Sequence, residues 1–365
     1  MDKDRVPELD LLRGVAILLV VLTHTADYIG DNPVLAYSKH GFIAVGLGAF
    51  AFITGYGLEH GWLRKKEFSL RQYVQRRLWR VYVPYLIALA VFFLVFGVFR
   101  VHRSIPFDLI SINTIVHILG LQGLFSPQYA HIFTLWYIGL LLPMYAVFPL
   151  LLARKDQTRY IIRCTLLIMG CAIALRYFFN IIDIRFFAFF PIFIAGLIAR
   201  RAGLLTPLLK KKWGIVSLIG FVALYMAYMK VWGGAVIYDH WKGDNTAFFI
   251  GPILSTFALI AFALVASLCF MRFVVRSPQL QWVVDGLAFI AAGAYFIYLF
   301  HRPIFAIHTW LVEDILALPP AYITPLFVLM TVAMVVACGF AEKAYVERVY
   351  KPRIGNITRN ARLET

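Results

Sequence analysis

The sequence is poor in charge, and poorest in acidic residues. Only 15% of its 365 residues are charged, with 19 Asp and Glu against 35 Lys and Arg. A soluble domain of this length needs more polar surface, so the composition excludes that class. The four cysteines form no CxxC pair, which excludes a disulfide framework and a zinc signature, and we expect no metal. A convincing internal repeat is also missing, which disfavours an inverted-repeat transporter.

Long apolar runs fill most of the chain. Hydrophobic residues make up 61% of it, and runs of about 20 residues recur throughout, which is the length of a bilayer-spanning helix. Continuous runs predict helices, whereas a membrane β-barrel has short alternating segments. We expect an all-α, polytopic protein of the plasma membrane with about ten transmembrane helices. The expected spans are residues 9–28, 41–60, 81–99, 132–152, 160–178, 186–200, 213–231, 247–271, 285–310 and 321–341.

The basic residues are unevenly divided between the loops. With these spans, 26 of the 35 basic residues fall on the side of both termini and eight on the other. Lys and Arg accumulate in cytoplasmic loops, so both termini are expected to be cytoplasmic. The same bias accounts for the net charge of +16 without a nucleic-acid partner. We expect one transmembrane domain over residues 1–345 and a basic cytoplasmic tail over 346–365.

The first span contains two polar residues in the stretch "RGVAILLVVLTH". Arg13 and His24 are eleven positions apart, which places them on nearly the same helix face, about 16 Å apart along the axis. Ionisable groups inside a span cost a few kcal/mol unless they face protein or water. The pattern favours a polar path through the bundle, although Arg13 as an interfacial anchor and His24 as an interhelical hydrogen-bonding group remain open. His301 has a similar depth in its span, so the two imidazoles are expected to lie side by side.

Three arginines gather where the third span begins. Arg76, Arg77 and Arg80 lie within about one helical turn, in the stretch "RRLWRVYVPY". Guanidinium groups bind phosphate oxygens in bidentate fashion, so the cluster suits a phosphate ligand. An ordinary inner-face anchor explains the spacing equally well.

Several segments together resemble the acyltransferase-3 family of membrane O-acyltransferases. The matches run in order from residue 9 to about 352, so they cover nearly the whole chain. The family's larger branch has glutamates where this chain has Leu140, Leu141 and Leu142, so the likeness is to compact, stand-alone members without a fused secreted domain. The matching stretches are "LDLLRGVAILLVVLTH", "AFITGYGL", "RRLWRVYVPY", "FTLWYIGLLLPMYAVFPLL", "YFIYLFHRPI" and "EKAYVERVYKP".

The resemblance implies an enzyme that moves an acyl group, commonly acetyl from acetyl-CoA, to a hydroxyl on the outer side. It implies acyl-CoA as donor substrate, no tightly bound cofactor, and an extracytoplasmic glycan or lipid-linked sugar as acceptor. By position, Arg13 and His24 match the first motif, Arg77 and Arg80 the basic motif, and His301 the late histidine. A transporter or flippase of a polar solute is the competing function, because intramembrane Arg and His also mark permeation paths.

Catalytic roles follow from this likeness and from the chemistry of the side chains. His24 is expected to take the proton of the acceptor hydroxyl as general base, because imidazole titrates near neutral pH. An acyl-His24 intermediate is the other possible route. Asp27 or Tyr28 is expected to orient His24, while His301 or Trp136 lines the acyl site or donates to the carbonyl oxygen.

The arginines are expected to hold the donor. Arg13 contacts the pantetheine amides or a phosphate of the coenzyme in this hypothesis. Arg76, Arg77 and Arg80 bind the nucleotide end at the cytoplasmic mouth.

Overall fold

The computed structural model describes residues 6–25, 28, 33–63, 69–98, 112–129, 135–152, 158–232 and 250–355. Over these ranges the chain forms helices and no strand, which confirms the all-α prediction. Asp27 lies outside the described residues. The longer helices are α1 (Pro7–Thr25), α2 (Pro33–Leu63), α4 (Val83–Phe92), α7 (Trp136–Leu151), α8 (Thr158–Phe179), α9 (Phe186–Arg201), α11 (Lys211–Trp232), α12 (Ile250–Arg276), α13 (Gln281–Ala292), α14 (Ala294–Thr309) and α15 (Pro320–Tyr345).

Shorter helical pieces extend or connect these helices. Four are π-helical turns: η1 (Leu78–Tyr82), η2 (Phe93–Val98), η6 (Trp310–Ile315) and η7 (Val346–Tyr350). The others are α3 (Leu70–Arg77), α5 (Ile112–Ile118), α6 (Gln122–Tyr129), α10 (Leu205–Leu208) and the 3-10 turn η5 (Pro278–Leu280). Residues 70–98 run as one long helix, and the last helix continues past α15 to residue 355.

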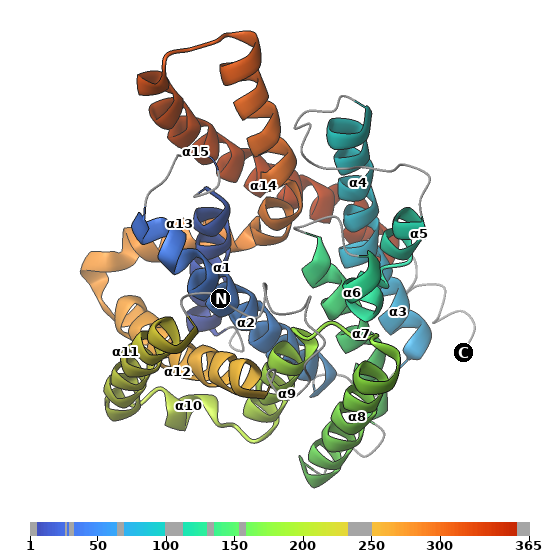
Figure 1. Ribbon diagram of the computed structural model, residues 1–365. Helices are drawn as coiled ribbons and strands as arrows, with labels where there is room; N and C mark the ends of the chain where they lie inside the picture. The colour runs from blue at the N-terminus through green and yellow to red at the C-terminus, as the bar shows by residue number, and fades with distance from the viewer. Residues whose placement is uncertain are drawn as a thin grey trace.

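Helices α1 and α2 lie in the middle of the molecule, and most other helices surround them (Figure 1). Helix α2 packs along α9, and α1 packs against α2, α12, α13 and α14. Helices α11 and α12 form a pair at one side, and α14 pairs with α15 at another. The two helices that carry the expected histidines, α1 and α14, are therefore direct neighbours.

Helices α2 and α9 approach each other closely at two glycines. A Cβ atom on Gly55 would lie 2.0 Å from the carbonyl oxygen of Phe193, and one on Gly196 would lie 2.1 Å from that of Phe52. Small residues let helix backbones approach closely where no hydrophobic effect drives helices together in lipid. This close packing therefore requires glycine at both positions.

Several helices are long and apolar enough to cross a membrane. Among the described residues five qualify, or six if a bent pair counts as one span. They match the expected spans near 41–60, 81–99, 160–178, 247–271 and 321–341, with the bent pair near 285–310. The side chains of Leu166, Leu167 and Phe178 on α8 are two-thirds exposed or more, as lipid-facing residues are. The fold is that of a multi-pass membrane protein.

The remaining expected spans form helices that are short or carry charge. Helices α7 and α9 have 16 residues each, and the apolar part of α11 is residues 212–227. Helix α1 contains Glu8, Asp10 and Arg13 among its 19 residues. The expectation of one continuous helix over 285–310 is wrong, because α13 and α14 are separated at Gly293 and bent by 70°.

The described part of the segment between η2 and α7 contains two short helices, α5 and α6. Gln122 on α6 donates to the carbonyl oxygen of Leu135 at 3.0 Å and to the hydroxyl of Tyr85 at 3.2 Å. A Cβ on Gly123 would lie 2.2 Å from the carbonyl oxygen of Gly139, so α6 lies directly on the first turns of α7. These contacts fix the start of α7, where Trp136 and the next residue enter the core.

We predict that Gly55→Ala destabilises the protein by about 1–3 kcal/mol, because the added methyl group meets a backbone oxygen. Gly170 on α8 is the matched control, since a Cβ there has nothing within 4 Å. Gly170→Ala should leave stability unchanged or raise it by about 0.5–1 kcal/mol. Thermal unfolding of the purified variants in detergent measures the difference. Equal melting temperatures would contradict the close packing of α2 on α9.

Candidate active site

A cavity of about 340 Å³ lies among α1, α2, α3, η1, α7, α13, α14 and α15. Its charged lining in the described chain consists of the cations Arg13, Arg77 and Arg80 and the anion Glu342. Three positive charges against one negative charge make the cavity attractive to anions. The other polar residues that line it are Thr54, Tyr137, Tyr145, Tyr295 and Tyr298.

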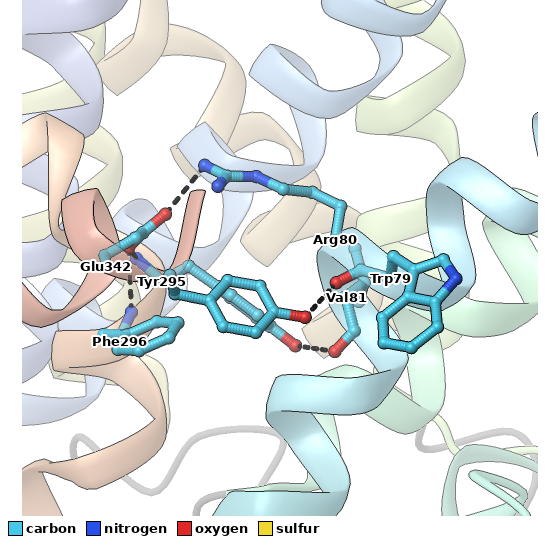
Figure 2. A network of polar contacts seen from close by, with 7 residues as sticks. Trp79, Arg80, Val81, Tyr295, Phe296 and Glu342 are labelled. Carbon is cyan, nitrogen blue, oxygen red and sulfur yellow. Dashed lines mark hydrogen bonds and ion pairs between the residues drawn. The ribbon is translucent and has the colours of Figure 1, made fainter. Parts of the chain in front are cut away.

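Glu342 on α15 joins three helical segments (Figure 2). Its Oε1 accepts a hydrogen bond from Arg80 Nη2 at 2.7 Å. Its Oε2 accepts from the backbone N–H groups of Tyr295 and Phe296, each at 3.1 Å. These two N–H groups belong to the first turn of α14, where no carbonyl of the same helix precedes them. Glu342 therefore caps α14, and its charge complements the positive end of that helix.

The π-helical turn η1 is fastened to the same helices by two tyrosines. Tyr295 donates its hydroxyl hydrogen to the carbonyl oxygen of Val81 at 2.7 Å, and Tyr345 donates to that of Trp79 at 2.5 Å (Figure 2). A π-turn disturbs the regular backbone ladder, and such turns occur often at functional sites. Arg80 lies between these two carbonyls in the chain, so its backbone is held on both sides.

Arg77 and Arg13 complete the cationic part of the cavity. The Arg77 guanidinium lies over the rings of Tyr73 and Tyr145, at 5.6 Å and 5.0 Å from their centroids. Arg13 lies close enough to Glu342 and Arg80 for their charges to act on it. The structure does not bring Arg76 to the cavity lining, because neighbouring residues on a helix point about 100° apart. The predicted phosphate cluster is thus reduced to Arg77 and Arg80.

The predicted contact between the two histidines is confirmed. The rings of His24 on α1 and His301 on α14 stack, with centroids 5.1 Å apart and planes at 28°. His301 is fully buried, and its Nδ1 lies 3.0 Å and 2.9 Å from the carbonyl oxygens of Ile297 and Tyr298. Carbonyl oxygens only accept, so Nδ1 carries the hydrogen. In the neutral ring Nε2 then holds the lone pair, and it has no hydrogen-bond partner in the described part of the chain.

Two tyrosines connect the cavity to the histidine pair. Tyr298 lines the cavity, and its ring centroid is 6.3 Å from that of His301. Tyr137 also lines the cavity and lies 6.1 Å from Tyr298, edge to face. His24 and His301 are not part of the cavity lining, and Tyr298 is the lining residue whose ring lies next to His301.

The other predicted site residues lie elsewhere. The ring of Trp136 faces the Arg185 guanidinium at 3.7 Å and is not part of the cavity lining. Arg185 in turn forms a buried ion pair with Asp183. Tyr28 accepts a hydrogen bond from Arg302 at 3.4 Å, and its role in orienting His24 stays a prediction.

Glu342 and the polar uncharged residues that line the cavity, Tyr137 among them, were not predicted from the sequence. Glu342 is a single carboxylate in the last apolar stretch, and an ionisable residue within a span is itself a signal of function. Tyr137 directly follows Trp136 in the "LWY" stretch. The sequence does not show which of these two aromatic residues lines the cavity, and the structure assigns that position to Tyr137. Over the described residues, no group of three or more His, Cys, Asp or Glu is arranged to hold a metal ion.

The fold and the cavity define a multi-pass helical membrane protein with a buried, mainly cationic site. A family model described as an acyltransferase domain matches residues 6–341. The chain belongs to the acyltransferase-3 family, a family of membrane acyltransferases. A search of curated proteins and a search of solved structures found no match.

We predict that Glu342→Ala destabilises the fold by at least about 2 kcal/mol, because two N–H groups of α14 and Arg80 lose their acceptor. Arg80→Ala is the comparison, since the Arg80 side chain is 34% exposed and Glu342 keeps its two backbone donors in that variant. The loss of stability in Arg80→Ala should be smaller than that in Glu342→Ala. Thermal unfolding measures both variants. A larger loss for Arg80→Ala would contradict the capping role of Glu342.

Proposed function

We propose that the protein is an acyl-CoA-dependent O-acyltransferase of the plasma membrane. It transfers an acyl group, most simply acetyl, to a hydroxyl of an extracytoplasmic glycan or lipid-linked sugar. The observation that carries this proposal is the cavity, which is lined by Arg13, Arg77 and Arg80 and by Tyr298, whose ring lies next to His301 of the stacked histidine pair.

The cationic end of the cavity suits the nucleotide end of the donor. Arg77 and Arg80 are one helical turn apart, and their guanidinium groups bind phosphate oxygens in this proposal. Arg13 contacts the pantetheine arm or a phosphate. The long pantetheine arm then extends along Tyr137 and Tyr298 and brings the thioester towards the histidines.

The chemistry requires a base, because a neutral hydroxyl is a poor nucleophile. His24 takes the proton of the acceptor hydroxyl while that oxygen attacks the thioester carbonyl carbon. The carbon–sulfur bond then breaks, and the leaving thiolate takes up the proton to give the free coenzyme thiol. His301, whose hydrogen is on Nδ1, offers Nε2 as a second proton acceptor beside His24.

The proposed topology has ten transmembrane helices and both termini in the cytoplasm. The 26 to 8 division of basic residues supports this orientation. Helices α1, α7, α9 and α11 occupy the positions of the four spans that are short or charged. With this orientation Arg13 faces the cytoplasm and His24 the outer side, as a cytoplasmic donor and an outer acceptor require.

We predict that His24→Ala retains acetyl-CoA binding but loses transfer by about 10²–10⁴-fold, because the general base is gone. Binding is measured by isothermal titration with purified protein. Transfer is measured as acceptor-dependent release of the coenzyme thiol. His308→Ala on α14 serves as the control and should remain active. Transfer by His24→Ala at near wild-type rate would show that His24 is not the base.

A second prediction tests the cavity itself. Gly57 lines the cavity, and a Cβ there has nothing within 4 Å, so Gly57→Phe fills the cavity without a backbone clash. We expect acetyl-CoA affinity to fall at least about tenfold, which corresponds to about 1.4 kcal/mol. Gly61 lies one turn further along α2 with equally open surroundings but outside the cavity lining, so Gly61→Phe is the matched control. Equal affinities of the two variants would place the donor elsewhere.

A further inference from the structure

The hydroxyl of Tyr137 is a buried donor without a hydrogen-bond partner among the described residues. The side chain is only 4% exposed, and it lines the cavity. Other tyrosines near the site use their hydroxyls: Tyr73 and Tyr295 each donate to a backbone carbonyl oxygen. A buried hydroxyl without a partner is unfavourable for folding, so its presence calls for a ligand that accepts its hydrogen.

The ring of Tyr137 is fixed in place by its neighbours. It meets the rings of Trp136, Phe189 and Tyr298 edge to face, with centroids between 5.9 and 6.1 Å away. The packing of α6 on the first turns of α7 also fixes its backbone. A donor that is held before the ligand arrives needs no reorganisation during a reaction.

We propose that the Tyr137 hydroxyl donates a hydrogen bond to the thioester carbonyl oxygen of the acyl donor. The inference rests on the proposed function, and it names the group that stabilises the reacting carbonyl. As the acceptor oxygen attacks, the carbonyl oxygen gains negative charge, and a fixed donor binds this charge more strongly than the neutral carbonyl. The Tyr137 hydrogen stays on the phenol throughout, while the acceptor proton passes to His24 and then to the thiolate.

The surroundings favour Tyr137 over the two donors expected from the sequence. The Trp136 ring is covered by Arg185 and lies outside the cavity lining. The hydrogen of His301 is directed at the carbonyl oxygens of Ile297 and Tyr298. Tyr137, in contrast, lines the cavity together with the arginines, and its ring contacts Tyr298, which is the next ring towards His301.

The test uses Tyr137→Phe, which removes one oxygen atom and keeps the ring. We expect kcat to fall by about 10²-fold or more, with acetyl-CoA affinity within about twofold of wild type. The melting temperature should be unchanged or higher, because the removed hydroxyl has no partner in the folded protein. Purified protein in detergent, acetyl-CoA and a soluble glycan acceptor provide all three readouts.

Tyr85→Phe is the matched control. The Tyr85 hydroxyl donates to the carbonyl oxygen of His117 at 2.5 Å and accepts from Gln122, and Tyr85 is not part of the cavity lining. This variant should lower the melting temperature while leaving kcat of the folded protein near wild type. The two variants therefore separate a catalytic hydroxyl from a structural one.

Three results would overturn the inference. A kcat of Tyr137→Phe within twofold of wild type shows that the hydroxyl does not act on the reacting carbonyl. A loss of acetyl-CoA affinity with unchanged kcat assigns the hydroxyl to ground-state binding of the pantetheine arm instead. If the wild-type protein consumes no acetyl-CoA, the proposed function fails and the inference fails with it, whereas the first two results leave the proposed function intact.

Discussion

The carboxylate of Glu342 joins three segments that are far apart in the sequence. One oxygen binds Arg80 of η1, and the other binds the two N–H groups that begin α14. Those N–H groups exist as free donors only because the helix is broken at Gly293, so the break and the carboxylate depend on each other. A buried carboxylate is tolerable where its oxygens are bonded in this way. This one group therefore links the break before α14, the position of Arg80 and the first turn of α14.

The shape of the cavity follows from the same bend. Glu342 caps the first turn of α14. The third turn of this helix brings His301 against His24 of α1, and its first two turns give Tyr295 and Tyr298 to the cavity wall. One carboxylate thus holds both Arg80 of the cavity lining and the first turn of the helix that carries His301. It also leaves a net positive lining, since Arg13 and Arg77 add two further cations.

Local sequence patterns predicted the parts of the site that depend on a single helix. The eleven-residue interval placed Arg13 and His24 on one helix, and matching depth predicted the contact with His301, which the stacked rings confirm. Apolar run lengths predicted an all-helical membrane protein. The bend at Gly293 was not predictable in this way, because the residues around Gly293 are apolar on both sides and the group that caps α14, Glu342, lies 47 residues from Tyr295 in the chain. Arg77 and Tyr137 line the cavity, whereas their neighbours Arg76 and Trp136 do not. This difference depends on helix packing, because adjacent residues of the same type belong to the same local sequence pattern.

The most direct test of the account is a density map of the protein with a non-hydrolysable thioether analogue of acetyl-CoA. The account predicts phosphate density within hydrogen-bonding distance of Arg77 and Arg80. It also predicts that the acyl carbon lies beside His24 and His301, with its oxygen towards the Tyr137 hydroxyl. A nucleotide bound outside the cavity, or an acyl group remote from the histidine pair, would contradict it.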